Sequence, residues 1–391
     1  MYIKIIKSQP MRLVITILLA IFLNQYIPLT LKELFLALSL SLKEILIFML
    51  PFLIFSSVYN AFAKIRGHAV MFTSLLLTCV ILSNFFSVNL AGVFSYSFVF
   101  NGASNLHSPK ETNELLALWE FGLPKLVSNN IVLLISLVLA YINKPIITKN
   151  VGMAAKICQK IVDKFLKKFF IPLLPLFVFG FMLKLLTEDI LSDVIAVNPK
   201  AFIYMITLLI FYLSFLLLLC RVLYKKKPLD ILRNIVAPTL TAFSSMSSAA
   251  ALPFSIAAAE KNTGNKSIAD VVMPATVNIH MIGDSICIPI LAMILISAFG
   301  LPEPSFHAYI IFALTFTITK FSGAGVPGGS ILVMIPVLEN CLGFTQEMSA
   351  LITICYMLID PITTSGNVLG NNIFVIHFNK LYHYINRKLM V

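Results

Sequence analysis

The stretch that decides the fold is Asp360-Pro-Ile-Thr-Thr-Ser-Gly-Asn-Val-Leu-Gly-Asn-Asn372, which holds one carboxylate, three hydroxyls and three amides. LITICYML (351–358) precedes it and IFVIHF (373–378) follows it, so these polar groups lie within an otherwise apolar segment. A central Asp in a bilayer is unfavourable by roughly 2.5 kcal/mol or more, and such residues usually serve a function. The stretch therefore predicts the centre of a site. The alternative is a short polar loop between two half-length helices.

The composition excludes a soluble globular protein. Of 391 residues, 59% are hydrophobic and 12% are charged, and the mean hydropathy is +0.94. Apolar segments of 18 or more residues recur along the chain, which is typical of a polytopic all-α membrane protein. The net charge of +12 comes from Lys and Arg in short loops, so we expect it to set membrane topology and not to bind nucleic acid. The six cysteines lie singly, which predicts neither a disulfide framework nor a zinc site.

The first 229 residues contain six expected spans. The N-terminal apolar run lacks a small-x-small cleavage site, so we expect an uncleaved first span. The segment 144–168 is rich in lysine and is expected to be a loop. The six spans are expected near Met11–Ile27, Ile45–Ala63, within Val70–Phe100, and near Asn130–Ile142, Phe169–Leu186 and Ala201–Leu219.

Basic loops alternate consistently with these spans. The N-terminus, Lys64–Arg66, 144–168 and Arg221–Lys227 fall on one side of the expected membrane, and the positive-inside rule makes that side cytoplasmic. Arg387 and Lys388 require the C-terminus to lie there too. The sequence thus predicts a multi-pass protein of the cell membrane with both termini in the cytoplasm.

Beyond residue 229 the hydrophobic segments are interrupted. Ile231–Glu260 is broken at 239–248, and His307–Glu339 is broken at 322–330, with an expected continuous helix, Ile268–Ala298, between them. The flanking charges suggest that the first broken segment enters from the cytoplasmic face and the second from the opposite face. Two such hairpins, each followed by a full helix, form an inverted repeat, which predicts a transporter site near the bilayer midplane.

The hairpin tips carry residues suited to a small ligand. The second tip, 323–328, formally matches G-x-G-x-x-G, but no strand precedes it, so an unwound gating tip is favoured over a dinucleotide site. A purely structural turn is the alternative. At the first tip, Ser244 and Ser245 are expected to satisfy backbone groups, whereas Ser247 and Ser248 lie at a helix N-terminus that suits a carboxylate.

Two further polar groups stand out at membrane depth. His280 and Asp284 are four residues apart, so on one helix they would share a face and form an ion pair or a proton relay; a plain structural pairing is the alternative. With no third ligand in view, a metal pair is disfavoured. Lys320, just before the second tip, either reaches the membrane surface by snorkelling or has a role in the site.

In these motifs the chain resembles the dicarboxylate/amino acid:cation symporter family, the glutamate transporter homologues, over nearly its whole length. The matching segments are Met49–Ser57 (MLPFLIFSS), the serine-rich Ala242–Pro253, Pro274–Asp284, the glycine-rich Gly323–Gly328 and Asp360–Asn371. Pro274–Asp284 lies where the family has a helix break.

The resemblance implies eight transmembrane helices plus two re-entrant helical hairpins, working as an elevator in a homotrimer. Residues 1–229 would contain the first six helices. Of these, helices one, two, four and five would form the scaffold, and helices three and six would belong to the transport domain. The core transport domain would be 230–391. Its parts would be hairpin 230–262, helix 267–299, hairpin 305–343 and helix 345–381.

The resemblance also implies roles for single residues. Asp360 would bind a substrate amino group, Thr364, Asn367 and Ser248 its carboxylate, and Gly325 and Val326 would close the outer gate. The full implied substrate set is Ser247, Ser248, Met281, Asp284, Gly325, Val326, Asp360, Thr363, Thr364 and Asn367. The implied cation or proton set is Asn278, His280, Asp284, Asn367 and Asn371.

Departures from the family pattern point to a different substrate. The arginines that bind an acidic side chain in the family lie at Thr363 and Met246 here, and a family threonine is replaced by Asp284. Without an arginine there is no bidentate partner for a side-chain carboxylate. We therefore expect a neutral or cationic amino acid. A sodium-coupled glutamate, aspartate or dicarboxylate symporter is the alternative.

The sodium motif is eroded as well. Family positions for asparagine and aspartate hold His280 and Ile282, and a family aspartate is Asn371. Since hard cations need oxygen ligands, we expect proton coupling through His280 and Asp284, or exchange, ahead of sodium symport. No cofactor and no confidently assigned metal are expected, and the partners are a small-molecule substrate and membrane lipid.

Two readings of other classes compete with a secondary transporter. An intramembrane hydrolase could use a serine with His280 or His377, but the sequence has no G-x-S-x-G elbow. A channel-like or receptor relative would also fit a degraded cation motif. We expect the protein not to be an enzyme.

Overall fold

The computed structural model describes residues 9–65, 70–100, 115–124, 127, 129–142, 145–188, 200–322 and 328–389. All of the regular structure in these ranges is helical, as expected from the composition. The two chain regions on either side of residue 229 differ in how their helices are built, and they are described in turn.

The first region has a helix at the place of each of the six expected spans and one further helix, α6 (Pro145–Phe165), where a loop was expected. The second helix is much longer than expected, because it begins at Leu29. Two of the helices continue into one turn of π-helix. The elements are α2 (Gln9–Leu23), α3 (Leu29–Ile65), α4 (Val70–Ser95) with η1 (Tyr96–Phe100), α5 (Asn129–Tyr141), α6 (Pro145–Phe165) with η2 (Leu166–Phe170), α7 (Ile171–Thr187) and α9 (Ala201–Tyr224).

The second region consists mainly of shorter helices in pairs, followed by one very long helix. The elements are α10 (Pro228–Ser245), α11 (Ser248–Thr263), α12 (Lys266–Thr276), α13 (Ile282–Ala298), α14 (Phe306–Thr319) with the short η3 (Lys320–Ser322), α15 (Gly329–Leu342) and α16 (Gln346–Leu389). The helix pairs α10–α11 and α14–α15 lie where the two hairpins are expected, and the first break is confined to Met246–Ser247, which is narrower than expected.

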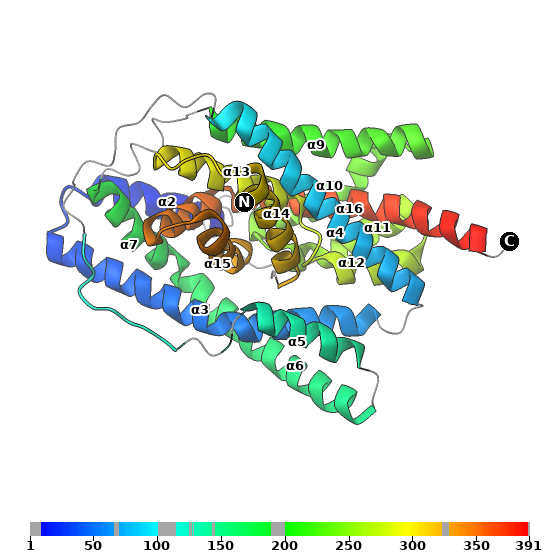
Figure 1. Ribbon diagram of the computed structural model, residues 1–391, viewed down its shortest axis with the longest axis horizontal. Coiled ribbons are helices and arrows are strands. Elements are labelled where there is room, and N and C mark those ends of the chain that lie inside the picture. Colours follow the sequence, from blue (N-terminus) through cyan, green and yellow to red (C-terminus); the bar gives the residue numbers. More distant parts are fainter. Residues whose placement is uncertain are drawn as a thin grey trace.

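The helices form two bodies. Helix α3 packs along α5, α6 and α7, and α2 packs against α7, which makes a layer along the lower and left side of Figure 1. Helices α13 and α16 lie at the centre of the other body, where α4, α9, α10, α11 and α15 pack on one or both of them. Most of the buried apolar side chains of α13 and of the first half of α16 belong to one core cluster.

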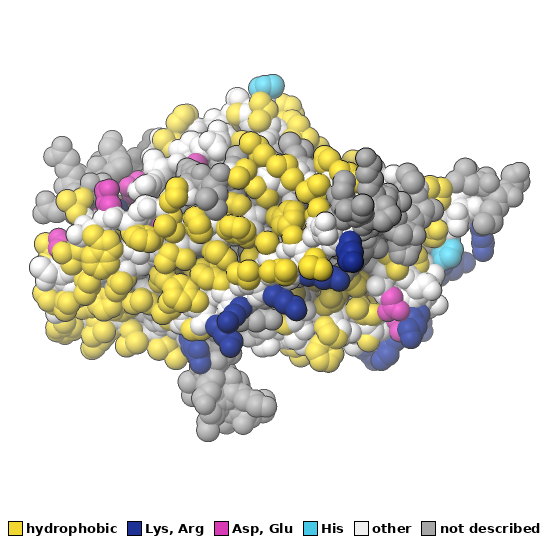
Figure 2. Space-filling model, turned by 90° about the horizontal axis from the view of Figure 1, so that it is seen from below, with side chains coloured by type: hydrophobic (Ala, Val, Ile, Leu, Met, Phe, Trp, Pro, Cys, Tyr) yellow, Lys and Arg dark blue, Asp and Glu magenta, His cyan; other side chains and the backbone are white. Residues whose placement is uncertain are grey.

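The outer surface is that of a membrane protein. Figure 2 shows hydrophobic side chains over most of the face turned to the viewer, with basic side chains in a row across it. Three stretches of the described chain are long and apolar enough to cross a bilayer: Met71–Val99, Phe202–Tyr224 and Gln346–Arg387.

The lysine-rich segment 144–168 is not the expected loop but the helix α6. Ala155 and Val162 are buried on one side of this helix. Its exposed residues include the apolar Met153, Ile157 and Ile161 as well as Lys149, Lys156, Lys160 and Lys164. The density of lysine conceals the helical period in the sequence.

The expected continuous helix over 268–298 is broken instead. Helix α12 ends at Thr276, α13 begins at Ile282, and the side chain of Asn84 on α4 binds the backbone between them. Its amide donates to the Ile279 carbonyl (2.6 Å) and its oxygen accepts from the Met281 N–H (3.3 Å). A break inside a membrane protein needs such partners for its freed backbone groups, so Asn84 makes this break possible.

Helix α16, in contrast, runs without interruption from Gln346 to Leu389 through the polar stretch 360–372. The alternative of a short polar loop at this position is therefore wrong. Helix α13 crosses α16 very closely at Gly283, where an added Cβ would overlap the carbonyl oxygen of Thr363. Only glycine permits this approach of the two helices.

Candidate functional site

Two buried carboxylates, Asp284 at the start of α13 and Asp360 in α16, define the candidate site. Their exposed fractions are 0% and 2%. The hydroxyl of Tyr356 lies between them, 2.8 Å from Asp284 Oδ1 and 3.4 Å from Asp360 Oδ1. One hydroxyl has one proton to donate, so Tyr356 links the two carboxylates but binds Asp284 more closely.

Asp360 is held by the second hairpin and by its own helix. Its Oδ2 accepts a hydrogen bond from the backbone N–H of Gly328 (2.8 Å), the first described residue after the hairpin tip. Its Oδ1 accepts one from the hydroxyl of Thr364, one helical turn on (2.6 Å). These donors stabilise an ionised carboxylate inside the protein. The central role expected for Asp360 fits this position.

The other expected residues of α16 surround this carboxylate. Thr363 is fully buried and donates to the Asp360 carbonyl (3.1 Å). Asn367 accepts from the backbone N–H of Asp284 (3.1 Å), which joins the start of α13 to α16. Four residues expected from the sequence, Asp284, Asp360, Thr364 and Asn367, are thus brought together by α13 and α16.

The expected pair of His280 and Asp284 does not form. His280 lies in the break before α13, where its Nε2 is 2.9 Å from the Ser83 hydroxyl and its ring lies 4.2 Å from that of Phe374. The helical spacing of four that predicted a shared face does not apply across an unwound segment. Among the described residues the two side chains thus have other partners, and proton coupling through them stays a prediction.

Lys320 is the partner of Asp284. Its Nζ lies 2.8 Å from Asp284 Oδ2, and both side chains are fully buried. The ammonium also lies 5.5 Å from the centre of the Phe316 ring. Of the two alternatives for Lys320, snorkelling to the surface is excluded, because its side chain has no exposed fraction.

The remaining expected residues lie around this cluster or outside the described chain. Ser247 caps α11 by accepting from Ala250 N–H (3.2 Å), and Ser248 is buried. The first hairpin reaches α16 through contacts of Ala242 and Ala251 with Val368. Met281 accepts from Ser330 (3.5 Å), Asn371 is buried and Asn278 lies in the α12–α13 break. Gly325 and Val326 lie outside the described residues.

Sequence reasoning missed Tyr356, Gly328, Ser330 and Asn84 as parts of this arrangement. Tyr356 could have been found, because it precedes Asp360 by one helical turn and so shares its face. Asn84 and Ser330 gave no local signal, since each lies far along the chain from its partner. The second candidate base, His377, contacts the Leu216 carbonyl (3.2 Å) and the Tyr224 hydroxyl (3.0 Å). His377 Nε2 also lies 3.4 Å from the Cys220 Sγ, so its neighbour is a thiol and not the serine that the hydrolase alternative requires.

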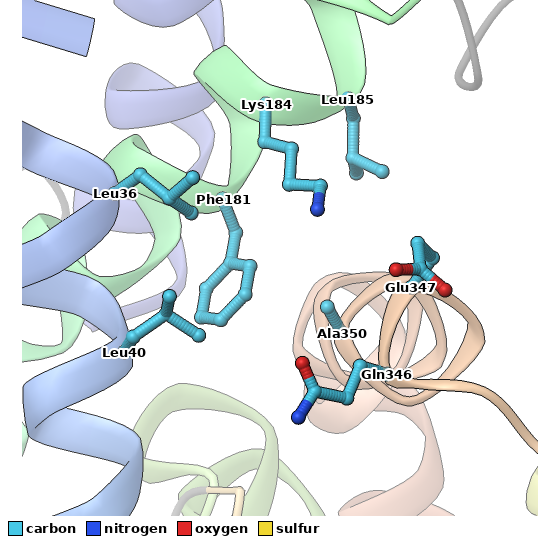
Figure 3. Close-up of a pocket in the computed structure, with 8 residues that line it drawn as sticks. All are labelled: Leu36, Leu40, Phe181, Lys184, Leu185, Gln346, Glu347 and Ala350. Atoms are coloured by element: carbon cyan, nitrogen blue, oxygen red, sulfur yellow. The ribbon is translucent and has the colours of Figure 1, made fainter. Parts of the chain in front are cut away.

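A pocket opens elsewhere, between the two bodies (Figure 3). Leu36 and Leu40 of α3 and Phe181, Lys184 and Leu185 of α7 face Gln346, Glu347 and Ala350 at the start of α16. Glu347 precedes Asp360 by 13 residues of helix, or about 20 Å at 1.5 Å per residue. This pocket therefore belongs to the boundary between the bodies and not to the carboxylate cluster.

Comparison with known proteins extends over the whole of this architecture. The model of the sodium:dicarboxylate symporter family matches residues 10–381. A putative sodium-dependent excitatory amino acid transporter, glt-4, of Caenorhabditis elegans is 30% identical over 157 residues, 40% of this chain and 31% of the relative. Human excitatory amino acid transporter 1 is 26% identical over 188 residues (47% and 34%), and human neutral amino acid transporter A is 29% identical over 167 residues (42% and 30%).

These alignments span about a third of the length of each relative. The family match, in contrast, runs from the first described helix to the last and includes both hairpins, α13 and α16. Its members are transporters and not enzymes, which agrees with the expectation from the sequence and makes this a multi-pass membrane protein. The chain belongs to the sodium:dicarboxylate symporter family.

Proposed function

We propose that the protein is a secondary active transporter of amino acids, with the substrate amino group bound at Asp360. The observation that carries this is the charge of the buried cluster: two carboxylates, Asp284 and Asp360, share one ammonium, that of Lys320. One negative charge is left over, and it lies at Asp360 beside the second hairpin. A cationic group is the natural partner for it.

The substrate is a neutral or cationic amino acid. Between residues 234 and 386 the sequence contains no arginine, so the core offers no planar, bidentate partner for a second carboxylate. The positions of the family's arginines, Thr363 and Met246, are buried and uncharged here. The names of the relatives allow both outcomes, since they include excitatory and neutral amino acid transporters.

A dicarboxylate, which the family name suggests, is the second candidate. It would bring two negative charges to a cluster that already has one in excess. Buried like charges are unfavourable unless a cation accompanies them, so this candidate requires co-transported cations. The amino acid requires none at this position.

We further propose eight membrane spans, two re-entrant hairpins, cytoplasmic termini, a homotrimer and transport by an elevator movement. The division of the helices into two bodies supports the movement: α3, α5, α6 and α7 pack together, whereas α10, α11, α12 and α15 pack on α16, and α14 packs on α15. The exposed lysines of α6 support a cytoplasmic location for this helix. Because His280 and Asp284 do not pair, exchange of amino acids is proposed ahead of a proton relay.

The test is uptake of labelled amino acids into proteoliposomes loaded with the same amino acid or left empty. Serine, alanine, lysine, glutamate and aspartate are compared, with sodium and proton gradients imposed separately. We expect uptake of a neutral or basic amino acid, stimulated by internal substrate. Glutamate or aspartate uptake that outcompetes the others would contradict the substrate assignment, and saturable uptake of none of them would contradict the function.

A further inference from the structure

Lys320 occupies an unusual place in the second hairpin. It is the first residue of η3, directly before the hairpin tip, and Gly328 is the first described residue after the tip. Lys320 binds Asp284 of α13 and Gly328 binds Asp360 of α16, each at 2.8 Å. Both sides of the tip are thus tied to the two buried carboxylates, and one of these ties is an ion pair.

The chemistry of this position is that of a cation site. A bound metal cation would neutralise a carboxylate between the hairpin and the helices, with oxygen ligands around it. Here the carboxylate of Asp284 has the ammonium of Lys320 on one oxygen and the Tyr356 hydroxyl on the other. The ammonium supplies one positive charge and three donors, so Asp284 is already neutralised by a cation that belongs to the chain.

Two side chains beside Asp284 offer no oxygen ligand to a mobile cation. Ile282 contributes a buried alkyl group, and His280 contacts the Ser83 hydroxyl and lies 4.2 Å from the Phe374 ring in a tilted arrangement. Among the described residues, no group of three His, Cys, Asp or Glu side chains could hold a metal ion. A cation that bound to Asp284 Oδ2 would have to displace the ammonium of Lys320.

We propose that Lys320 is a resident cation that replaces a coupling metal ion. It neutralises Asp284 and ties the second hairpin to α13, so that substrate binding does not require sodium. The replacement of a coupling ion rests on the proposed transport function, but the ion pair between Lys320 and Asp284 can be tested without any substrate.

The experiment measures the thermal unfolding midpoint of the purified protein in detergent, in sodium chloride and in choline chloride of equal ionic strength. The wild type should show the same midpoint in both. Lys320→Ala leaves Asp284 buried and unpaired, so its midpoint should fall by several degrees in choline and recover in a saturable way as sodium is added. Lys380→Ala, at an exposed lysine of α16, is the matched control and should match the wild type.

The double variant Lys320→Ala with Asp284→Asn removes both charges and should lose the response to sodium. A sodium response of Lys320→Ala without amino acid uptake by the wild type would support the resident cation while contradicting the transport function. If Lys320→Ala does not fold, the proposal is tested on the wild type alone. Its uptake of the amino acid should then be equal in sodium chloride and in choline chloride. Strictly sodium-dependent uptake, or a Lys320→Ala midpoint that sodium does not change, would overturn the proposal.

Discussion

Asp360 combines a negative charge with two donors that hold it in place, the Gly328 N–H and the Thr364 hydroxyl. Asp360→Asn keeps the shape of the side chain but removes the charge that would attract an amino group. Because a hydrogen bond to a charged group contributes about 1.5–3 kcal/mol, the apparent affinity for substrate should fall roughly 10- to 100-fold. Competition binding with a labelled amino acid measures this.

Asp230→Asn is the control for this variant. Asp230 lies on α10, largely exposed, 3.7 Å from Arg233, and surface pairs of this kind contribute little. Its affinity for substrate should equal that of the wild type. An Asp360→Asn protein that unfolds normally and binds substrate as tightly as the wild type would refute the role of Asp360.

Gly283 sets the distance between α13 and α16. Gly283→Ala places a methyl group on the carbonyl oxygen of Thr363 and 3.0 Å from Asn367 Oδ1, so the two helices must move apart. We expect a loss of about 1–3 kcal/mol of stability from overpacking and weaker substrate binding. Gly122→Ala, where a Cβ meets nothing within 4 Å, should leave the midpoint of thermal unfolding unchanged.

At the scale of residues, the sequence indicated which polar groups matter better than it indicated their partners. Asp360, Thr364 and Asn367 lie on one uninterrupted helix, so their proximity follows from helical spacing. Asp284 and Lys320 are 36 residues apart and meet only because the tertiary fold brings the Lys320 ammonium to the start of α13. No local rule predicts such a pair, which is why His280 was wrongly chosen as the partner of Asp284.

At the scale of elements, the α12–α13 break depends on one side chain of another helix. Asn84→Ala would leave the Ile279 carbonyl and the Met281 N–H without their partner. Since an unsatisfied buried polar group costs about 1–3 kcal/mol, we expect a clear fall in the midpoint of thermal unfolding. Asn89→Ala is the control on the same helix, because Asn89 donates only to Phe85 of its own helix (2.7 Å).

An equal fall in both asparagine variants would show that Asn84 contributes no more than an ordinary helix residue.

The break between α12 and α13 could be suspected from Pro274 and Gly283, but its position could not, because the hydrogen bonds that fix it come from α4. Helix α6 presents the reverse case. The helical period is present in its sequence, but the high density of lysine is also typical of a cytoplasmic loop and therefore predicted one.

At the scale of the whole molecule, an elevator requires the body around α3 to slide past the body around α16. Leu36 of α3 and Ala350 of α16 face each other across the pocket between the bodies (Figure 3). In a variant whose six native cysteines are replaced, cysteines at these two positions joined by a flexible bismaleimide should stop uptake. Uptake into proteoliposomes before and after cross-linking is the measurement.

The matched control joins cysteines at Leu36 and Phe181, which lie on α3 and α7 within one body. That link should leave uptake unchanged. Full uptake with Leu36 and Ala350 cross-linked would refute a sliding movement at this boundary. Composition predicted the helical class and interrupted hydrophobicity predicted the breaks between the paired helices, whereas the sequence assigned helices to the two bodies only through resemblance. The movement of one body past the other is what this experiment tests.

The charges of the buried cluster also have an electrical consequence. With Lys320 paired to Asp284, the core carries one net negative charge whether or not a zwitterion is bound at Asp360. Exchange of one zwitterionic amino acid for another then moves no net charge across the membrane. A cationic substrate, in contrast, would respond to voltage by about 2.3 kcal/mol per 100 mV. The membrane potential of a cell, negative inside, would therefore drive the accumulation of basic amino acids, whereas it would not change the ratio of internal to external concentration of neutral ones.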